Sequence, residues 1–138
     1  MVANNTGAKS ALTVEKNITV RLPTELMIQI DSIMDSFGQY ADLLSVGDRE
    51  VYGMTEQFGA ITIIKSENPR EDWRYWICCG VLGGAVNPSQ TFAKIDQKGR
   101  AYLNRALRIG GKAPAIGDLI NALHDVLGIT FVEQEVVL

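Results

Sequence analysis

The chain has 138 residues, a length that suits one ordinary domain or two very small ones and excludes a multidomain enzyme. Hydrophobic residues make up 46% of it and charged residues 21%, so it can bury a core, which excludes wholesale disorder and collagen-like or disulfide-scaffold classes. A net charge of −3 argues against a globally basic nucleic-acid coat but allows a local basic face.

Neither a secretion signal nor a membrane span is predicted, because residues 1–10 lack an apolar h-region and no apolar run approaches about 18 residues. The two cysteines, Cys78 and Cys79, are neighbours in the sequence, which disfavours a disulfide between them. No second pair of Cys or His residues stands at metal-binding spacing. We therefore expect a cytoplasmic protein with free thiols that binds no metal, no cofactor and no membrane.

Composition divides the chain into three segments. Residues 1–13 are small and polar and predict a flexible or partner-ordered arm. Residues 14–84 predict an α+β part and residues 85–138 a basic C-terminal part, with Gly83-Gly84 and Asn87-Pro88 marking the boundary. The two larger segments are expected to form either two units or one continuous domain.

The first regular elements follow from two periodic patterns. Ile18, Val20 and Leu22 alternate with polar residues, as in a half-buried strand. Pro23 ends this strand and begins a long helix, predicted over residues 24–44. An a/d stripe of apolar residues runs along this helix: Leu26, Ile30, Ile33, Phe37, Tyr40 and Leu44. The stripe packs either on the chain's own sheet or on a second copy, and it is the predicted oligomer interface.

The middle of the chain predicts a short helix over residues 50–58 and then an antiparallel pair of strands over residues 60–65 and 73–80. Trp73 is expected on the same face as Tyr75 and Ile77, opposite Arg74 and Trp76. An aromatic face that carries an arginine has the chemistry to stack bases, although packing against a core is the simpler interpretation.

Charge is unevenly distributed towards the C-terminus. Residues 94–112 contain six basic residues and one acidic residue, a net charge of +5, whereas the remainder carries seven basic and fifteen acidic residues, a net charge of −8. Such a patch suits phosphate, another polyanion or an acidic face of a neighbouring subunit. The candidate phosphate-facing residues are Lys94, Lys98, Arg100, Arg105 and Arg108, with Arg21 as a candidate base reader.

Residues 93–108 resemble the signature of the AbrB and MraZ family of swapped-hairpin DNA-binding proteins. In that family an aspartate, a Gly-Arg turn, a short strand and a Leu-Arg pair recur at this spacing, as Asp96, Gly99-Arg100 and Leu107-Arg108 do here. The glycine permits a tight turn, and the two arginines can hold the aspartate or a phosphate. The resemblance implies DNA binding, and it extends through a final strand expected near residues 129–132.

A second resemblance lies near the N-terminus. Residues 19–26 look like the opening of a ribbon-helix-helix regulator, in which outward residues of a strand, here Asn17, Thr19 and Arg21, enter the major groove of DNA. That fold is an obligatory dimer. The resemblance therefore implies self-association together with binding to double-stranded DNA.

Catalytic machinery is not expected. The single histidine, His124, lies within an apolar stretch, and no triad, phosphate loop or dinucleotide fingerprint accompanies it. Two further helices are predicted near residues 100–108 and 116–127. The expected fold class is α+β: a small mixed domain with a long N-terminal helix, an antiparallel sheet and C-terminal helices. The expected function is that of a homo-oligomeric DNA-binding regulator; the alternative is a structural protein that builds a homo-oligomeric particle such as a virion.

Overall fold

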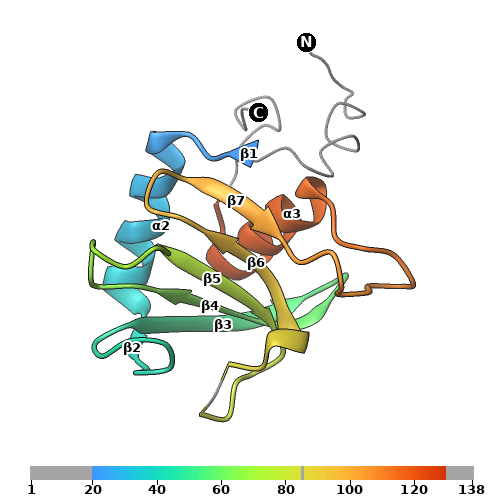
Figure 1. Ribbon diagram of the computed structural model, residues 1–138, viewed down its shortest axis with the longest axis horizontal. Helices are drawn as coiled ribbons and strands as arrows, with labels where there is room; N and C mark the ends of the chain where they lie inside the picture. Colours follow the sequence, from blue (N-terminus) through green and yellow to red (C-terminus); the bar gives the residue numbers. More distant parts are fainter. Residues whose placement is uncertain (1–19, 85, 130–138) are drawn as a thin grey trace.

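Seven antiparallel strands form one sheet in the part of the chain that this computed structural model describes, residues 20–84 and 86–129 (Figure 1). In the order in which they lie side by side, the strands are β1 (Val20–Arg21), β7 (Arg100–Leu103), β6 (Thr91–Ile95), β5 (Tyr75–Cys79), β4 (Gly59–Lys65), β3 (Arg49–Thr55) and β2 (Gln39–Tyr40). The helices of this part are α2 (Thr24–Phe37) and α3 (Ile116–Leu127), and a short 3-10 helix, η2 (Pro88–Gln90), precedes β6. Strands from both larger predicted segments therefore belong to one sheet.

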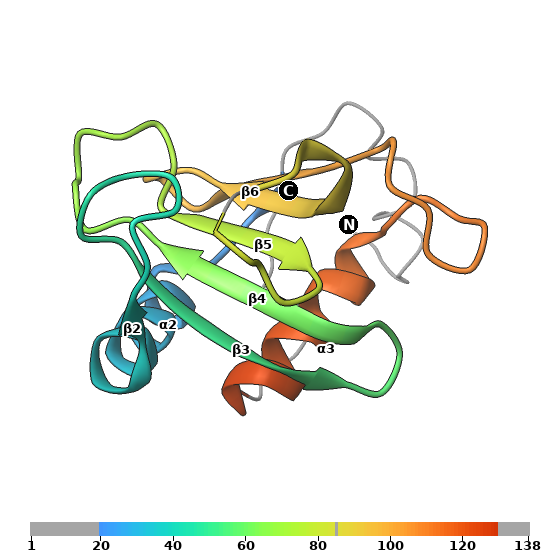
Figure 2. The same cartoon turned by 90° about the horizontal axis from the view of Figure 1, so that it is seen from below.

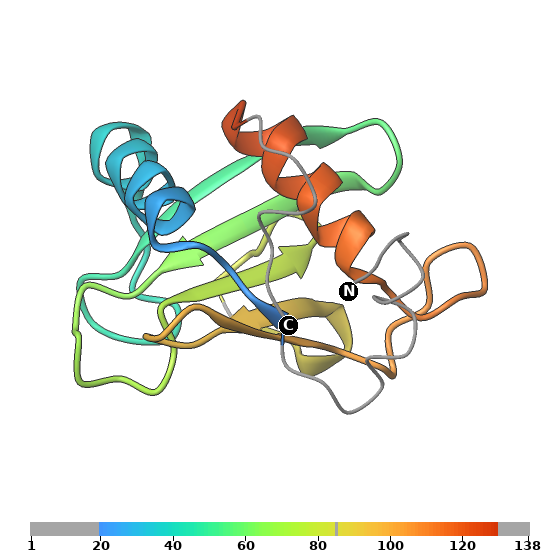
Figure 3. The same cartoon turned by 90° about the horizontal axis from the view of Figure 1, so that it is seen from above.

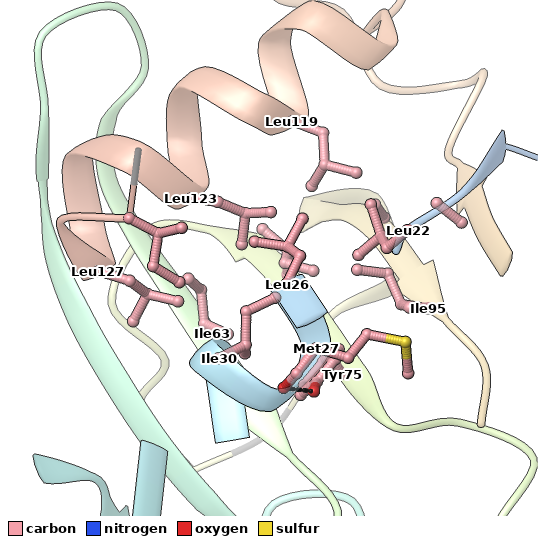
Figure 4. Close-up of a cluster of buried hydrophobic side chains, with 14 of the residues drawn as sticks. Leu22, Leu26, Met27, Ile30, Ile63, Tyr75, Ile95, Leu119, Leu123 and Leu127 are labelled. Carbon is pink, nitrogen blue, oxygen red and sulfur yellow. Dashed lines mark hydrogen bonds between the residues drawn. The ribbon is translucent and has the colours of Figure 1, made fainter. Parts of the chain in front are cut away.

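Both helices cover the same face of the sheet (Figures 2 and 3). Leu26 and Ile30 of α2 and Leu123 of α3 point towards strand residues such as Ile63 and Ile95, all of them buried (Figure 4). Burial of this apolar surface supplies most of the driving force for folding. The main core therefore lies between the sheet and the two helices.

The opposite, helix-free face carries a second, smaller cluster. Ile64, Trp73 and Cys78 are buried there, and partly buried residues from the connecting loops, among them Leu43 and Leu82, pack against them. The loops that supply this cover stand on the side of the sheet away from the helices (Figure 2). The strands β1, β7 and β6 contribute no residue to this cluster.

The predicted fold class is wrong. The described residues form mostly an antiparallel seven-stranded sheet with two short helices, not an α+β domain with a long N-terminal helix and several C-terminal helices. Two segments predicted as helices form strands, and the predicted long helix ends seven residues early.

The helix predicted over residues 24–44 ends at Phe37. The next residue, Gly38, is extended (φ −72°, ψ 147°), and its N–H donates a 2.8 Å hydrogen bond to the Met34 carbonyl. A side chain at position 38 would collide with that carbonyl oxygen. Beyond the glycine, Gln39–Tyr40 pair with the start of β3, so the last seven predicted helical residues form a strand and a loop.

The helices predicted over residues 50–58 and 100–108 are strands followed by turns. Val51 of β3 packs towards the helices, whereas Tyr52 is exposed and pairs with Thr62 of β4. Arg100–Leu103 form β7, because the chain reverses tightly after β6 at Gly99, whose φ is +85°. A Cβ at Gly99 would lie 3.0 Å from the Leu22 carbonyl oxygen and 2.6 Å from the Met27 sulfur, and together with the positive φ these contacts favour glycine in this turn.

Other predictions are confirmed. The strands predicted over residues 60–65 and 73–80 pair antiparallel as β4 and β5, in a register that runs from Ile61 opposite Cys79 to Lys65 opposite Tyr75. The helix predicted over residues 116–127 is α3, with the same bounds. Both cysteines are free, and Cys78 is buried.

The expected position of Trp73 is wrong. This residue precedes β5 and meets Trp76 edge to face, with ring centroids 6.2 Å apart.

Some predictions fall outside the described residues. These are the arm of residues 1–13, the start of the first strand, the outward residues Asn17 and Thr19, and all of the final strand except Ile129. Neither α2 nor α3 has the length and apolar character that crossing a membrane requires, a finding that applies to the described residues.

Candidate nucleic-acid interface

Three strands at one side of the sheet, β1, β7 and β6, bring basic residues together on the helix-free face (top of the sheet in Figure 1). Val20 is paired with Ala101, and both are buried in the main core. Because side chains alternate along a strand, the next pair, Arg21 and Arg100, lies on the opposite face. The sheet thus joins two residues that lie far apart in the sequence.

The same alternation places two more side chains beside this pair. Lys94 stands between the buried residues Ala93 and Ile95 of β6, and it is paired with Tyr102 of β7. The Lys94 ammonium lies 5.9 Å from the centre of the Tyr102 ring, within the range of a cation–π contact. We define the basic edge as Arg21, Lys94 and Arg100 of these strands together with Lys98 of the turn between β6 and β7, and Tyr102 lies beside Lys94 and Arg100.

A buried carboxylate, Asp96, organises the turn between β6 and β7. Its Oδ1 accepts the backbone N–H groups of Lys98 and Arg100, both at 2.9 Å. Its Oδ2 accepts the Arg100 Nε–H at 2.7 Å and the Tyr102 hydroxyl at 3.3 Å. One carboxylate therefore holds the hairpin turn, a guanidinium and an aromatic ring in fixed relative positions.

The Asp96 carboxyl and the Arg100 guanidinium are both ionised at neutral pH. Burial by itself would raise the pKa of the Asp96 carboxyl, but the hydrogen bonds from Arg100 and Lys98 outweigh burial, so the pKa lies below its ordinary value. The hydrogen bond to Asp96 also raises the pKa of the Arg100 guanidinium. In the described part of the chain the two Nη groups of Arg100 have no hydrogen-bond partner, and its side chain is 42% exposed.

The other basic residues of the predicted set are arranged differently. Lys94 forms an ion pair with the exposed Asp72, with 3.2 Å between Nζ and Oδ2. The exposed side chains of Arg21 and Lys98 have no ion-pair or hydrogen-bond partner among residues 20–84 and 86–129. Arg100 and Lys94 are thus held by carboxylates, while Arg21 and Lys98 are not.

Arg105 and Arg108 lie in the connection between β7 and α3, at the end of β7 away from the hairpin turn (Figure 1). The Arg108 guanidinium donates hydrogen bonds to the carbonyl groups of Arg105 and Leu107, at 2.6 and 3.0 Å, and does not reach Asp96. The predicted phosphate-facing set is therefore divided into the basic edge and a second group in this connection.

The residues of the predicted oligomer interface are also divided. Leu26 and Ile30 are buried in the chain's own core and Ile33 packs against it, so these three serve the fold. Phe37 is 76% exposed and Tyr40 72% exposed. Leu44 is exposed as well, in the loop after β2.

Trp76, on the aromatic face predicted from sequence to stack bases, is partly buried. Trp76 packs against the small cluster of the helix-free face and donates its Nε1–H to Thr91, while Arg74 pairs with Asp31 of α2. Tyr102, which the sequence interpretation missed, is the aromatic side chain of the basic edge. The alternating pattern Arg-Ala-Tyr-Leu over residues 100–103 carries the signal, provided that it is interpreted as a strand.

Comparison of the chain with known protein families, curated proteins and solved structures finds no match. In the described ranges no three His, Cys, Asp or Glu side chains gather as a metal site would require. The resemblances to swapped-hairpin and ribbon-helix-helix proteins remain predictions, and the chemistry of the basic edge is the basis for a functional proposal.

Proposed function

We propose that the protein is a DNA-binding regulator whose basic edge contacts the phosphate backbone, and that it acts as a homo-oligomer. The observation that carries this proposal is the cross-strand pair of Arg21 and Arg100 on the helix-free face, with Lys94 and Lys98 beside it. Arginine and lysine on an open surface are the groups that bind nucleic-acid phosphates.

Two features make these cations suited to an anionic ligand. Like charges directly opposite each other on neighbouring strands destabilise a sheet, and an anion bound between Arg21 and Arg100 relieves that repulsion. In addition, Asp96 holds the Arg100 guanidinium through Nε and leaves the Nη groups free for a bidentate contact with a phosphate. The acidic residue at this site therefore supports anion binding instead of opposing it.

Fluorescence anisotropy with a labelled random-sequence DNA duplex tests the proposal. Binding at about 50 mM salt is expected to weaken steeply at about 200 mM, because each phosphate contact releases counterions. Arg21→Ala and Arg100→Ala are each expected to weaken binding about fivefold for every sequence and to lower the salt slope by about one.

Lys112→Ala is the matched control. It removes the same charge from the exposed connection between β7 and α3, away from the hairpin turn of the basic edge, and is expected to leave the affinity within twofold. Absence of binding at low salt would contradict the proposal. Equal losses in all three variants would mean that net charge, and not the basic edge, governs binding.

A second candidate function, a structural protein that assembles into a homo-oligomeric particle, is favoured by a different surface. Exposed apolar side chains gather around the end of α2, β2 and the loop that follows: Phe37, Tyr40, Leu44 and Val46, the last of them 90% exposed. In the described part of the chain, β2 covers only Arg49 and Glu50 of β3, which leaves the edge of Val51–Thr55 unpaired. Both features suit contact with further copies.

Light scattering after gel filtration at micromolar concentration measures this self-association. We expect a species larger than the 15.1 kDa monomer. Phe37→Ser combined with Val46→Ser should shift it towards the monomer, since both side chains are exposed and the fold does not depend on them. A wild-type species of 15.1 kDa would contradict both oligomeric functions. A large oligomer without DNA affinity would favour the structural protein.

A further inference from the structure

We infer that the basic edge selects single-stranded nucleic acid, with an unpaired base stacked on Tyr102 and the flanking phosphates bound by Arg21, Lys94 and Arg100. This inference rests on the proposed function and specifies its ligand. The observation behind it is that an exposed aromatic ring lies among the cations on one sheet face and is held there by the same carboxylate as Arg100.

Tyr102 is placed for contact with a planar ligand. Its side chain belongs to the helix-free face and is 42% exposed, whereas Trp76 of β5 is partly buried against the small cluster of that face. Its hydroxyl is anchored on Asp96, and Lys94 approaches the ring. A ring that is already fixed loses little conformational entropy when a base stacks on it. Tyr102 is thus a preorganised platform with cations around it.

The shape of the site disfavours recognition of a duplex through its grooves. The sheet has seven strands, and at the usual strand spacing it is about 29 Å wide, whereas the major groove of DNA is about 12 Å wide. A sheet face of this breadth meets a duplex only at its phosphates. In a single strand the base faces are exposed, so the same surface gains a stacking contact in addition to the phosphate contacts. The preference for single strands follows from that additional contact.

Asp96 acts as a positioning residue in this arrangement. It bears a negative charge, so simple electrostatics predicts that its neutralisation strengthens binding to a polyanion. The geometry predicts the reverse, because Asp96 orients both the Arg100 guanidinium and the Tyr102 ring. Asp96→Asn should therefore weaken binding to single strands.

The experiment compares a labelled oligothymidine of about 20 nucleotides with a duplex of the same length, by anisotropy at one salt concentration. Wild-type protein is expected to bind the single strand about tenfold more tightly. Tyr102→Ala should abolish that preference, while Tyr102→Phe should keep most of it. Tyr102→Leu, which preserves apolar volume in the strand, should behave like Tyr102→Ala, so that a folding defect is not mistaken for lost stacking.

Tyr52→Ala is the matched control. Tyr52 is exposed on the same face of the sheet, but it lies on β3 between Glu50 and Met54, away from the basic edge. This variant should bind both probes as the wild type does. Equal wild-type affinity for the two probes, or an unchanged preference in Tyr102→Ala, would overturn the inference while the proposed function stands. Absence of binding to either probe would overturn both. Tighter binding by Asp96→Asn would overturn the positioning role.

Discussion

Replacement of Asp48 by alanine is expected to lower the free energy of unfolding by about 3 kcal/mol. The residue is 0% exposed, and its carboxylate accepts three backbone N–H groups, from Leu43 at 3.1 Å, Leu44 at 2.9 Å and Ser45 at 3.0 Å. Hydrogen bonds to a charged acceptor are worth more than neutral ones, and the donors left behind are partly buried. Urea denaturation followed by tryptophan fluorescence measures the loss.

Asp48→Asn keeps one acceptor oxygen, so its free energy of unfolding should lie between those of Asp48→Ala and the wild type. Asp42→Asn is the control in the same loop: Asp42 is exposed, accepts only the Gly47 N–H among the described residues, and has a positive φ of 50° that asparagine tolerates. It should change stability by less than about 0.5 kcal/mol. A similar loss of stability at both positions would contradict the stabilising role of the buried Asp48 carboxylate.

Substitution in the contact between α2 and the sheet should lower the free energy of unfolding by almost as much. Asp31→Ala is expected to cost about 2 to 3 kcal/mol, because it leaves Arg74 without its carboxylate and removes the nearer of the two alternative acceptors for the single Tyr75 O–H. That hydroxyl lies 2.5 Å from Asp31 Oδ1 and 2.9 Å from the Met27 carbonyl (Figure 4 shows the latter bond). A double-mutant cycle with Tyr75→Phe should return a coupling of about 1 kcal/mol or more. Additive losses would contradict the contact.

Alkaline pH provides an independent test of Tyr75. Burial, followed by the hydrogen bond to Asp31, raises the pKa of Tyr75 above its ordinary value. In the unfolded chain the phenol ionises near pH 10, while in the folded chain it stays protonated, so the wild type loses stability as pH rises above about 10. Tyr75→Phe lacks this loss. The stability gap between the two proteins should therefore narrow above about pH 10.

Local patterns predict some elements of this fold correctly. The β-branched run of residues 60–65 and the aromatic run of residues 73–80 identify β4 and β5, because both strands are buried in the sheet. The helical spacing from Ile116 to Leu127 identifies α3, since one face of that helix is buried. In these segments the local preference and the tertiary environment agree.

The other elements depend on contacts between distant residues. Arg100–Leu103 is a strand because Val20–Arg21 and β6 flank it, and no window around residue 100 contains that information. The long helix stops where β2 pairs with β3 and where Asp48 binds the backbone of the following loop. Hydrogen bonding outweighs the spacing of apolar residues in both segments: in β7 the partners are distant in the sequence, and at the end of the helix they lie within about the next eleven residues.

One part of the candidate site can be predicted from the sequence, and the other part depends on how the strands pair. The charge excess of residues 94–112 identifies Lys94, Lys98 and Arg100 from sequence alone. The place of Arg21 beside Arg100 is a consequence of strand pairing, and Tyr102 becomes a surface residue only when residues 100–103 alternate as a strand. Arg105 and Arg108 share the charge but not the location.

The pairing of β1 with β7 also has a consequence for how the chain folds. Val20 and Ala101 are partners in the sheet, although α2 and five strands separate them along the chain. Contacts between such distant residues slow folding, because a long loop must close before they form. During synthesis the first strand has to wait until the ribosome has released residues 100–103, whereas the five strands β2 to β6 can pair before then. The edge that holds Arg21 and Arg100 is consequently a late product of folding, and any capacity to bind a ligand there arises only once residues 100–103 have emerged.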